Sequence, residues 1–210
     1  MDNFESVIRT ELSFLGSQLV EEILKESTIL YVEKDTELVR DGQFIKVIPI
    51  VLNGLIKVFT RYEEKELLLY YIKPLESCVM SFSACLENSP SQIIAVTEEK
   101  TTVLLLPVSK IHQWVKNYSN FNQLFFQQYN IRYTELLKTI NHLVNDKLDV
   151  RLYNYLIDKK NLTQKNPIKI SHRQIANELG TAREVISRVL KKLENEEKVK
   201  QHTNEIEVFE

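Results

Sequence analysis

Charged and polar side chains recur at regular spacing over residues 183–191. Arg183, Glu184, Ser187 and Arg188 recur at helical spacing, so that at about 100° per residue they share one arc of a helix with Lys191. Arginine donates hydrogen bonds to guanine, glutamate accepts one from cytosine, and serine can contact either kind of base. Apolar residues occupy the opposite arc, namely Val185, Ile186, Val189, Leu190 and Leu193. The spacing predicts an amphipathic helix that reads a major groove.

A second, shorter helix is expected to precede this one and to position it. Ser171 and Gln174 have the spacing of a capping box, and Gly180 supplies a residue that can adopt positive φ and turn the chain. Thr181 and Glu184 repeat the capping-box spacing at the start of the next helix. Two capped helices around one glycine predict a helix-turn-helix.

A short hairpin is expected to follow the two helices. Residues 199–201 and 206–209 alternate as short strands around a polar turn, which would make the C-terminal region a winged helix. The tip of such a wing lies near phosphates, so Lys200, Thr203 and Asn204 are candidate backbone contacts. The alternative is an ordinary polar turn without a DNA contact.

The run GTAREVISRVLKKLE, preceded by SHRQIANEL, resembles the signature of the Crp/Fnr superfamily of bacterial transcription regulators. The resemblance implies a homodimer on a palindromic operator with TGTGA-like or TTG-like half-sites, and RNA polymerase as a further partner. It implies that Arg183, Glu184 and Arg188 read the half-site, with Ser187 contributing in some branches. Residues at positions that hold phosphates in the family are Ser171, Arg173 and Thr181, and Lys191 lies beside them on the polar face. This chain departs from the family at residues 196–198, where members often carry a glycine before the wing.

The N-terminal part of the chain changes from a helical to a strand-like pattern. Residues 4–24 carry apolar side chains at spacings of three and four, which predicts an amphipathic helix. Residues 28–108 consist of short runs rich in Val, Ile, Tyr and Leu, separated by turn signals, which predict antiparallel strands. The resemblance implies that these strands form the cupin-like β-roll of the cyclic-nucleotide-binding fold. The expected class is therefore α+β.

A long helix is expected between the β-roll and the C-terminal domain, at about residues 110–147. Apolar residues repeat within it at alternating spacings of three and four, as in a coiled-coil seam. They are Phe126, Tyr129, Tyr133, Leu136, Ile140 and Leu143. Either this helix packs only on its own β-domain or the seam joins two copies of the chain. We expect the dimer, with a domain of residues 1–148 followed by a DNA-binding domain of residues 149–210.

The segment between Lys73 and Lys100 bears on ligand binding. The resemblance implies an effector pocket here, with Glu76, Ser77, Cys78 and Gln92 as candidate lining residues. A cyclic phosphate requires a cation or a helix N-terminus, but this segment contains no lysine or arginine, and Gln92 or Ile93 stands where the family has its arginine. We therefore expect no binding of cyclic AMP or cyclic GMP, and the effector stays unknown.

No metal or other cofactor is expected. The two cysteines, Cys78 and Cys85, form no CxxC pair and are read as small buried apolar residues, with redox sensing as the alternative. The histidines lie apart, at His112, His142, His172 and His202, without metal-ligand spacing, although His172 and His202 could approach DNA.

Composition and charge narrow the class of function. The chain has neither an apolar run long enough for a membrane span nor a secretory signal, so we expect a cytoplasmic protein. Residues 146–210 hold 13 Lys and Arg against 11 Asp and Glu, a net +2 within a chain of net −2. An enzyme is the weakest hypothesis, because no phosphate-binding loop, nucleophile motif or metal motif is present. A DNA-binding regulator is favoured over a ligand- or redox-sensing β-roll protein that has lost DNA binding.

Overall fold

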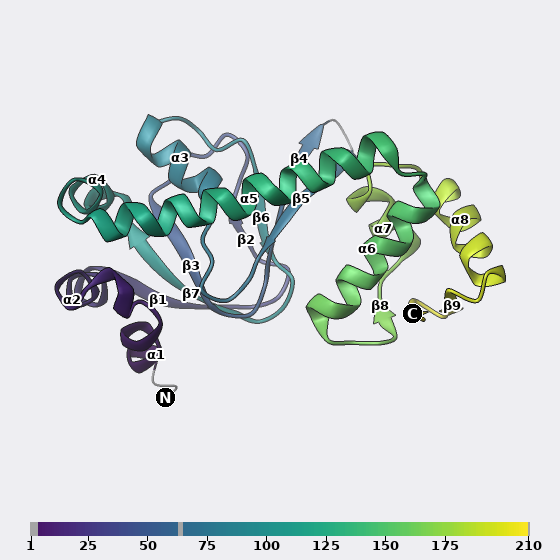
Figure 1. Ribbon diagram of the computed structural model, residues 1–210, viewed down its shortest axis with the longest axis horizontal. Coiled ribbons are helices and arrows are strands. Elements are labelled where there is room, and N and C mark those ends of the chain that lie inside the picture. The colour runs from purple at the N-terminus through teal and green to yellow at the C-terminus, as the bar shows by residue number, and fades with distance from the viewer. Residues whose placement is uncertain (1–3, 63–64, 210) are drawn as a thin grey trace. The chain divides into compact units, whose positions relative to one another are not determined.

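The computed structural model describes residues 4–62 and 65–209, without the side chains of residues 65, 138–139 and 141–145. The chain forms two compact units, one of residues 1–60 with 69–136 and one of residues 61–68 with 137–210 (Figure 1). The predicted boundary, between residues 148 and 149, lies at the start of helix α6.

The N-terminal segment folds into three short helices. These are α1 (Phe4–Glu11), the 3-10 helix η1 (Ser13–Leu15) and α2 (Ser17–Glu26). The prediction of one helix over residues 4–24 is therefore wrong. Gly16 has a φ of +88°, which ends η1 and lets the chain turn before α2. The apolar spacing survives the break, because Ile8, Leu15, Leu19 and Ile23 are all buried in one core.

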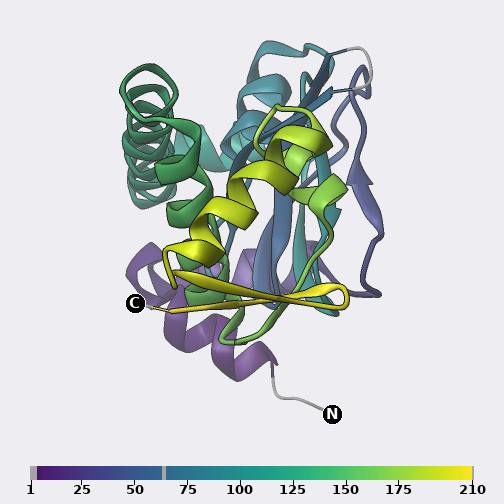
Figure 2. The same cartoon turned by 90° about the vertical axis from the view of Figure 1, so that its right-hand side faces the viewer.

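Seven strands follow and form two antiparallel sheets, as the strand-like runs predict. The strands are β1 (Thr28–Val32), β2 (Glu37–Val39), β3 (Val47–Asn53), β4 (Ile56–Tyr62), β5 (Lys65–Ile72), β6 (Ile94–Thr97) and β7 (Thr101–Pro107). One sheet has the order β1-β7-β3 and the other β2-β6-β4-β5 (Figures 1 and 2). Gly54 joins β3 to β4 with a φ of +95°, and a Cβ there would lie 2.7 Å from the carbonyl oxygen of Lys100. Only glycine fits this turn.

Three helices pack on this sheet domain. Helix α3 (Val79–Glu87) interrupts the strands and was not predicted, because it is short and mostly apolar. Helices α4 (Val108–Asn117) and α5 (Ser119–Asn145) cover the predicted helical region, with a break at Tyr118. Trp114 and Phe121, on either side of that break, are fully buried in the same core as Ile48 and Leu104 of the sheet.

The C-terminal unit is a winged helix with the predicted order of elements. Its members are α6 (Leu148–Thr163), β8 (Ile168–Lys169), α7 (His172–Glu178), α8 (Arg183–Asn195), β9 (Val199–His202) and β10 (Glu205–Val208). The strands form an antiparallel sheet of order β8-β10-β9. Its core includes a buried ion pair, in which Lys159 Nζ of α6 lies 3.3 Å from the Glu178 carboxylate of α7. Tyr155 donates to the same carboxylate at 2.6 Å.

Candidate nucleic-acid interface

The turn between α7 and α8 fixes the first half of the interface. Ser171 caps α7 as predicted, because its Oγ accepts a hydrogen bond from the Gln174 amide at 3.1 Å. Gly180 has a φ of +65°, and the Thr181 amide donates to the Ala176 carbonyl at 2.9 Å. These bonds close the end of α7 and direct the chain into α8.

The start of α8 differs from the prediction. Its N-cap is Ala182, without a side-chain hydrogen bond, so the expected capping box of Thr181 and Glu184 is wrong. The bond of the Thr181 amide to α7 holds this residue in the turn, and the helix therefore begins two residues later, at Arg183. Glu184 lies in the first turn with its side chain exposed to solvent.

Helix α8 separates apolar and polar side chains as the spacing predicts. Ile186, Leu190 and Leu193 are at most 1% exposed. Arg183, Glu184, Arg188 and Lys191 are exposed on the other side. Neither Arg183 nor Arg188 forms an ion pair or a side-chain hydrogen bond with any residue that the structure describes. Their guanidinium donors are therefore available to an external acceptor.

Ser187 is placed differently from its charged neighbours. It is half-buried, and its Oγ donates to the Arg183 carbonyl at 3.1 Å. The same Oγ lies 2.9 Å from Nδ1 of His172, the first residue of α7. His172 was not among the predicted site residues, because the pairing joins two helices across the turn.

The wing presents its predicted residues to solvent. Lys200, Thr203 and Asn204 are exposed, and Asn204 adopts a φ of +62° at the hairpin turn. Glu194 of α8 anchors the wing, since it accepts from the backbone and side-chain nitrogens of Gln201 at 2.8 and 2.9 Å. These two bonds hold the pKa of Glu194 below its usual value.

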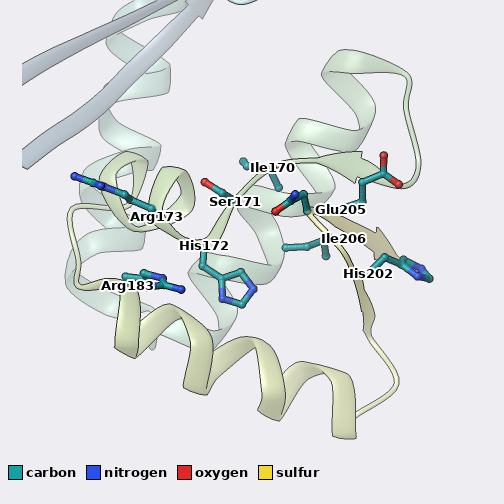
Figure 3. A pocket seen from close by; sticks show the side chains of 9 residues that line it. Ile170, Ser171, His172, Arg173, Arg183, His202, Glu205 and Ile206 are labelled. Carbon is teal, nitrogen blue, oxygen red and sulfur yellow. The ribbon is translucent and has the colours of Figure 1, made fainter.

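A cavity of about 460 Å³ lies where α7, α8 and the wing meet. Figure 3 shows Arg173, Arg183 and His172 around it, with His202 on the wing side. Its lining residues are Ile170, Ser171, His172, Arg173, Arg183, His202, Asn204, Glu205 and Ile206. Two arginines and the Ser171 hydroxyl offer donors to an anionic group such as a phosphate, and Glu205 places a carboxylate on the wing side of the same hollow.

Helix α5 carries both buried and exposed side chains. Phe125, Gln128 and Arg132 are at most 6% exposed. Most of the predicted seam is exposed, by 74% at Phe126, 38% at Tyr129, 62% at Tyr133, 46% at Leu136 and 45% at Ile140. Leu143 lies among the residues whose side chains the structure does not describe. Most of the seam is therefore exposed beside the buried face of α5, and the Tyr129 hydroxyl donates to the Val79 carbonyl at 3.4 Å.

The predicted effector residues differ in their surroundings. Glu76 is ion-paired with Arg132 of α5, Ser77 and Cys78 are at most 1% exposed, and Gln92 is exposed on the surface. Arg132 also pairs with Glu135, donates to the Tyr71 carbonyl at 3.0 Å and stacks over the Tyr70 ring. Sequence reasoning missed Arg132, because its partner Glu76 is 56 residues away.

Both cysteines are buried and free of disulfides. Burial raises the pKa of the Cys85 thiol, which opposes formation of a reactive thiolate. This environment does not favour the redox-sensing alternative.

Comparisons with known proteins find one matching family model and several similar solved structures. Residues 150–209 match the family model of the Crp-like helix-turn-helix domain. A solved Crp/Fnr-family transcriptional regulator from Eubacterium rectale is 22% identical, with a TM-score of 0.86, over 95% of this chain and 93% of its own. The c-di-GMP-responsive global regulator CLP of Xanthomonas campestris is 17% identical, with a TM-score of 0.80, over 92% of this chain and 99% of its own. No curated protein matches the chain.

A Thermus thermophilus transcriptional regulator of the CRP/FNR family is also similar, with 17% identity and a TM-score of 0.74 over 87% of this chain and 94% of its own. Among the described residues, no helix is long and apolar enough to cross a membrane. Residues 150–209 therefore match the Crp-like helix-turn-helix domain, and the chain has the fold of these solved Crp/Fnr-family structures.

Proposed function

We propose that this protein is a transcription regulator that binds a palindromic operator as a homodimer. The observation that carries the proposal is the exposed polar face of α8, on which Arg183 and Arg188 have no ion-pair partner within the described residues. A surface helix that only needed solubility would gain from pairing these cations with neighbouring carboxylates. Available guanidinium donors at helical spacing suit the acceptors on base edges.

The proposed contacts follow from the chemistry of each side chain. Arg183 and Arg188 donate to guanine O6 and N7, and Glu184 accepts from a cytosine amine, each contributing about 1–3 kcal/mol of discrimination. Ser187 is assigned to a base contact as well, and the remaining contacts are to phosphates, which position the helix without reading sequence. The residues assigned to them are Ser171, Arg173, Thr181, Lys191, Lys200, Thr203 and Asn204. Ser171 remains suited to this role, because its capping bond uses an oxygen lone pair and leaves the hydroxyl hydrogen.

The homodimer is supported by the exposed seam of α5. Large aromatic and aliphatic side chains at heptad spacing are stable in water when a second helix covers them. An isologous pair of α5 helices would give a twofold protein. Such a protein can place two reading helices about 34 Å apart, one on each half-site of a palindrome.

We propose that cyclic AMP does not regulate the protein. Glu76, the carboxylate among the candidate effector residues, is already ion-paired with Arg132. The segment between Lys73 and Lys100 supplies no cation for a cyclic phosphate. A calorimetric titration should detect no binding of cyclic AMP or cyclic GMP, whereas micromolar binding of either would overturn this part of the proposal.

The remaining parts of the proposal concern setting and partners. A regulator of this kind acts in the cytoplasm and works through contacts with RNA polymerase. It performs no catalysis of its own. The effector and the regulated genes are left open.

The proposal is tested by selecting binding sites from a random duplex library with the purified protein and no added ligand. We expect enrichment of a palindrome with guanine in each half-site. The matched control is Arg183→Ala/Arg188→Ala, which removes both proposed guanine contacts from exposed positions and should enrich no guanine-dependent site. Absence of any enriched sequence with the unmodified protein would contradict the proposed function.

A further inference from the structure

The hydroxyl of Ser187 is held by two groups of the protein at once. Its Oγ lies 3.1 Å from the Arg183 carbonyl oxygen and 2.9 Å from Nδ1 of His172. The first partner belongs to the preceding turn of α8, and the second to the first residue of α7. The side chain of Ser187 is thus held by residues of both α7 and α8.

Counting hydrogens shows what this hydroxyl can offer to DNA. A serine hydroxyl has one hydrogen and two lone pairs. The Arg183 carbonyl can only accept, so a hydrogen directed there requires that His172 Nδ1 carry a hydrogen and donate to Ser187. If Nδ1 is instead bare, the hydroxyl hydrogen is directed to His172. In both arrangements the hydrogen points into the protein, and a lone pair is left for an outside donor.

We propose that Ser187 reads DNA as a hydrogen-bond acceptor and selects a base with an exocyclic amino group, with His172 as the positioning residue. In the major groove only adenine N6 and cytosine N4 provide such a donor, whereas guanine and thymine present acceptors. The inference rests on the proposed function, and it adds a specificity that the charged residues do not provide. Ser187 follows Arg183 by one helical turn and directly precedes Arg188, so the selected amino group belongs to the same half-site as their guanines.

The test measures the affinity of four proteins for the selected operator and for all its single base-pair substitutions. The proteins are the unmodified chain, Ser187→Ala, His172→Phe and His172→Asn. We expect the unmodified chain to prefer adenine or cytosine over thymine or guanine at one base pair of each half-site, by about threefold to tenfold. Ser187→Ala and His172→Phe should lose this preference. His172→Asn should retain it, because an asparagine amide can donate where Nδ1–H does.

A modified base separates the amino group from the rest of adenine. Where adenine is preferred, 2-aminopurine keeps the pairing with thymine but moves the amino group into the minor groove. It should weaken binding of the unmodified chain by the same factor as Ser187→Ala, and it should not weaken Ser187→Ala further.

Two results would overturn the inference while sustaining the proposed function. In the first, the guanine preference depends on Arg188, but the preferences at all other base pairs are the same for Ser187→Ala and His172→Phe as for the unmodified chain. The other is a preference lost in Ser187→Ala at a position where thymine or guanine is favoured, which would make the hydroxyl a donor. Failure of the unmodified chain to select any site would overturn both the inference and the proposed function. Equal thermal unfolding of the four proteins excludes misfolding as the cause.

Discussion

The two units of the molecule use arginine in opposite ways. In the N-terminal unit, Arg132 is 5% exposed, and it is paired with Glu76 and Glu135 and stacked 4.7 Å above Tyr70. In the C-terminal unit, Arg183 and Arg188 are exposed and have no internal partner among the described residues. Burial by itself would lower the pKa of Arg132, but the two carboxylates raise it above its usual value.

The guanidinium group in the N-terminal unit binds other groups of the protein, whereas those in the C-terminal unit are exposed to solvent. A buried guanidinium must be matched by carboxylates and carbonyls, since an uncompensated charge is expensive away from water. Once matched inside the fold, those groups are no longer available to a ligand. An exposed guanidinium with available donors contributes little to stability and can contribute fully to recognition. The first arrangement holds the fold together, and the second can bind DNA.

The largest change in stability is expected on replacement of the buried arginine of the N-terminal unit. Arg132→Met leaves Glu76 and Glu135 without their cation, and we expect it to lower the free energy of unfolding by about 3 kcal/mol. This is the lower end for a buried pair, because Glu135 keeps a side-chain exposure of 35%. Denaturant unfolding measures the change, with Glu135→Gln as a milder control. An unchanged midpoint for Arg132→Met would show that the ion pair does not stabilise the unit.

The second prediction concerns the exposed seam of α5. Leu136→Glu/Ile140→Glu places charges at two exposed seam positions and should give monomers, whose operator affinity should be about 100-fold lower through loss of bivalency. Light scattering and binding titrations measure the two effects. The control is Thr134→Glu, an exposed polar position of the same helix, which should remain dimeric. A dimer mass for the double variant would show that the seam does not join two copies of the chain.

A third substitution addresses the exposed arginines directly. Arg188→Ala should cost about 1–3 kcal/mol of discrimination between operator and mutated operator, while the free energy of unfolding changes by less than about 0.5 kcal/mol. Binding to operator variants and denaturant unfolding measure the two quantities. If Arg188→Ala destabilised the fold as much as Arg132→Met, the contrast between the two arginines would be wrong.

The smallest expected change is in the pH dependence of the stability of the fold. Asp149 accepts from Lys192, and this bond, together with the Val150 amide, holds the pKa of Asp149 below its ordinary value. A carboxyl group with a lowered folded-state pKa stabilises the fold above its ordinary pKa, and that contribution disappears as the pH falls through the lowered value. Below about pH 4, Asp149→Asn should therefore lose slightly less stability with falling pH than the unmodified protein does. Denaturant unfolding between pH 2 and pH 6 would contradict this if both proteins gave the same curve.

Local patterns in the sequence predicted the C-terminal unit well. The Ser171 cap, the turn at Gly180 and the two faces of α8 each depend on residues within a few positions of one another. The cap of α8 was mispredicted, because the bond of the Thr181 amide to α7 competes with the capping-box pattern.

Contacts between distant segments could not be predicted in the same way. Glu76 and Arg132 are brought together by packing of α5 on the strands, and His172 meets Ser187 across a turn. No spacing rule encodes either pair. Spacing did predict a seam on α5, but the buried position of Arg132 on the same helix emerged only from the fold.

We expect α8 to recognise a DNA sequence without an added ligand. The most direct test is the affinity of the purified protein for the selected palindrome and for a scrambled duplex of equal length, measured over a range of salt concentrations. We expect a steep fall of both affinities with salt and at least about a thousandfold preference for the palindrome at physiological salt. Equal affinity for the two duplexes at every salt concentration would contradict it.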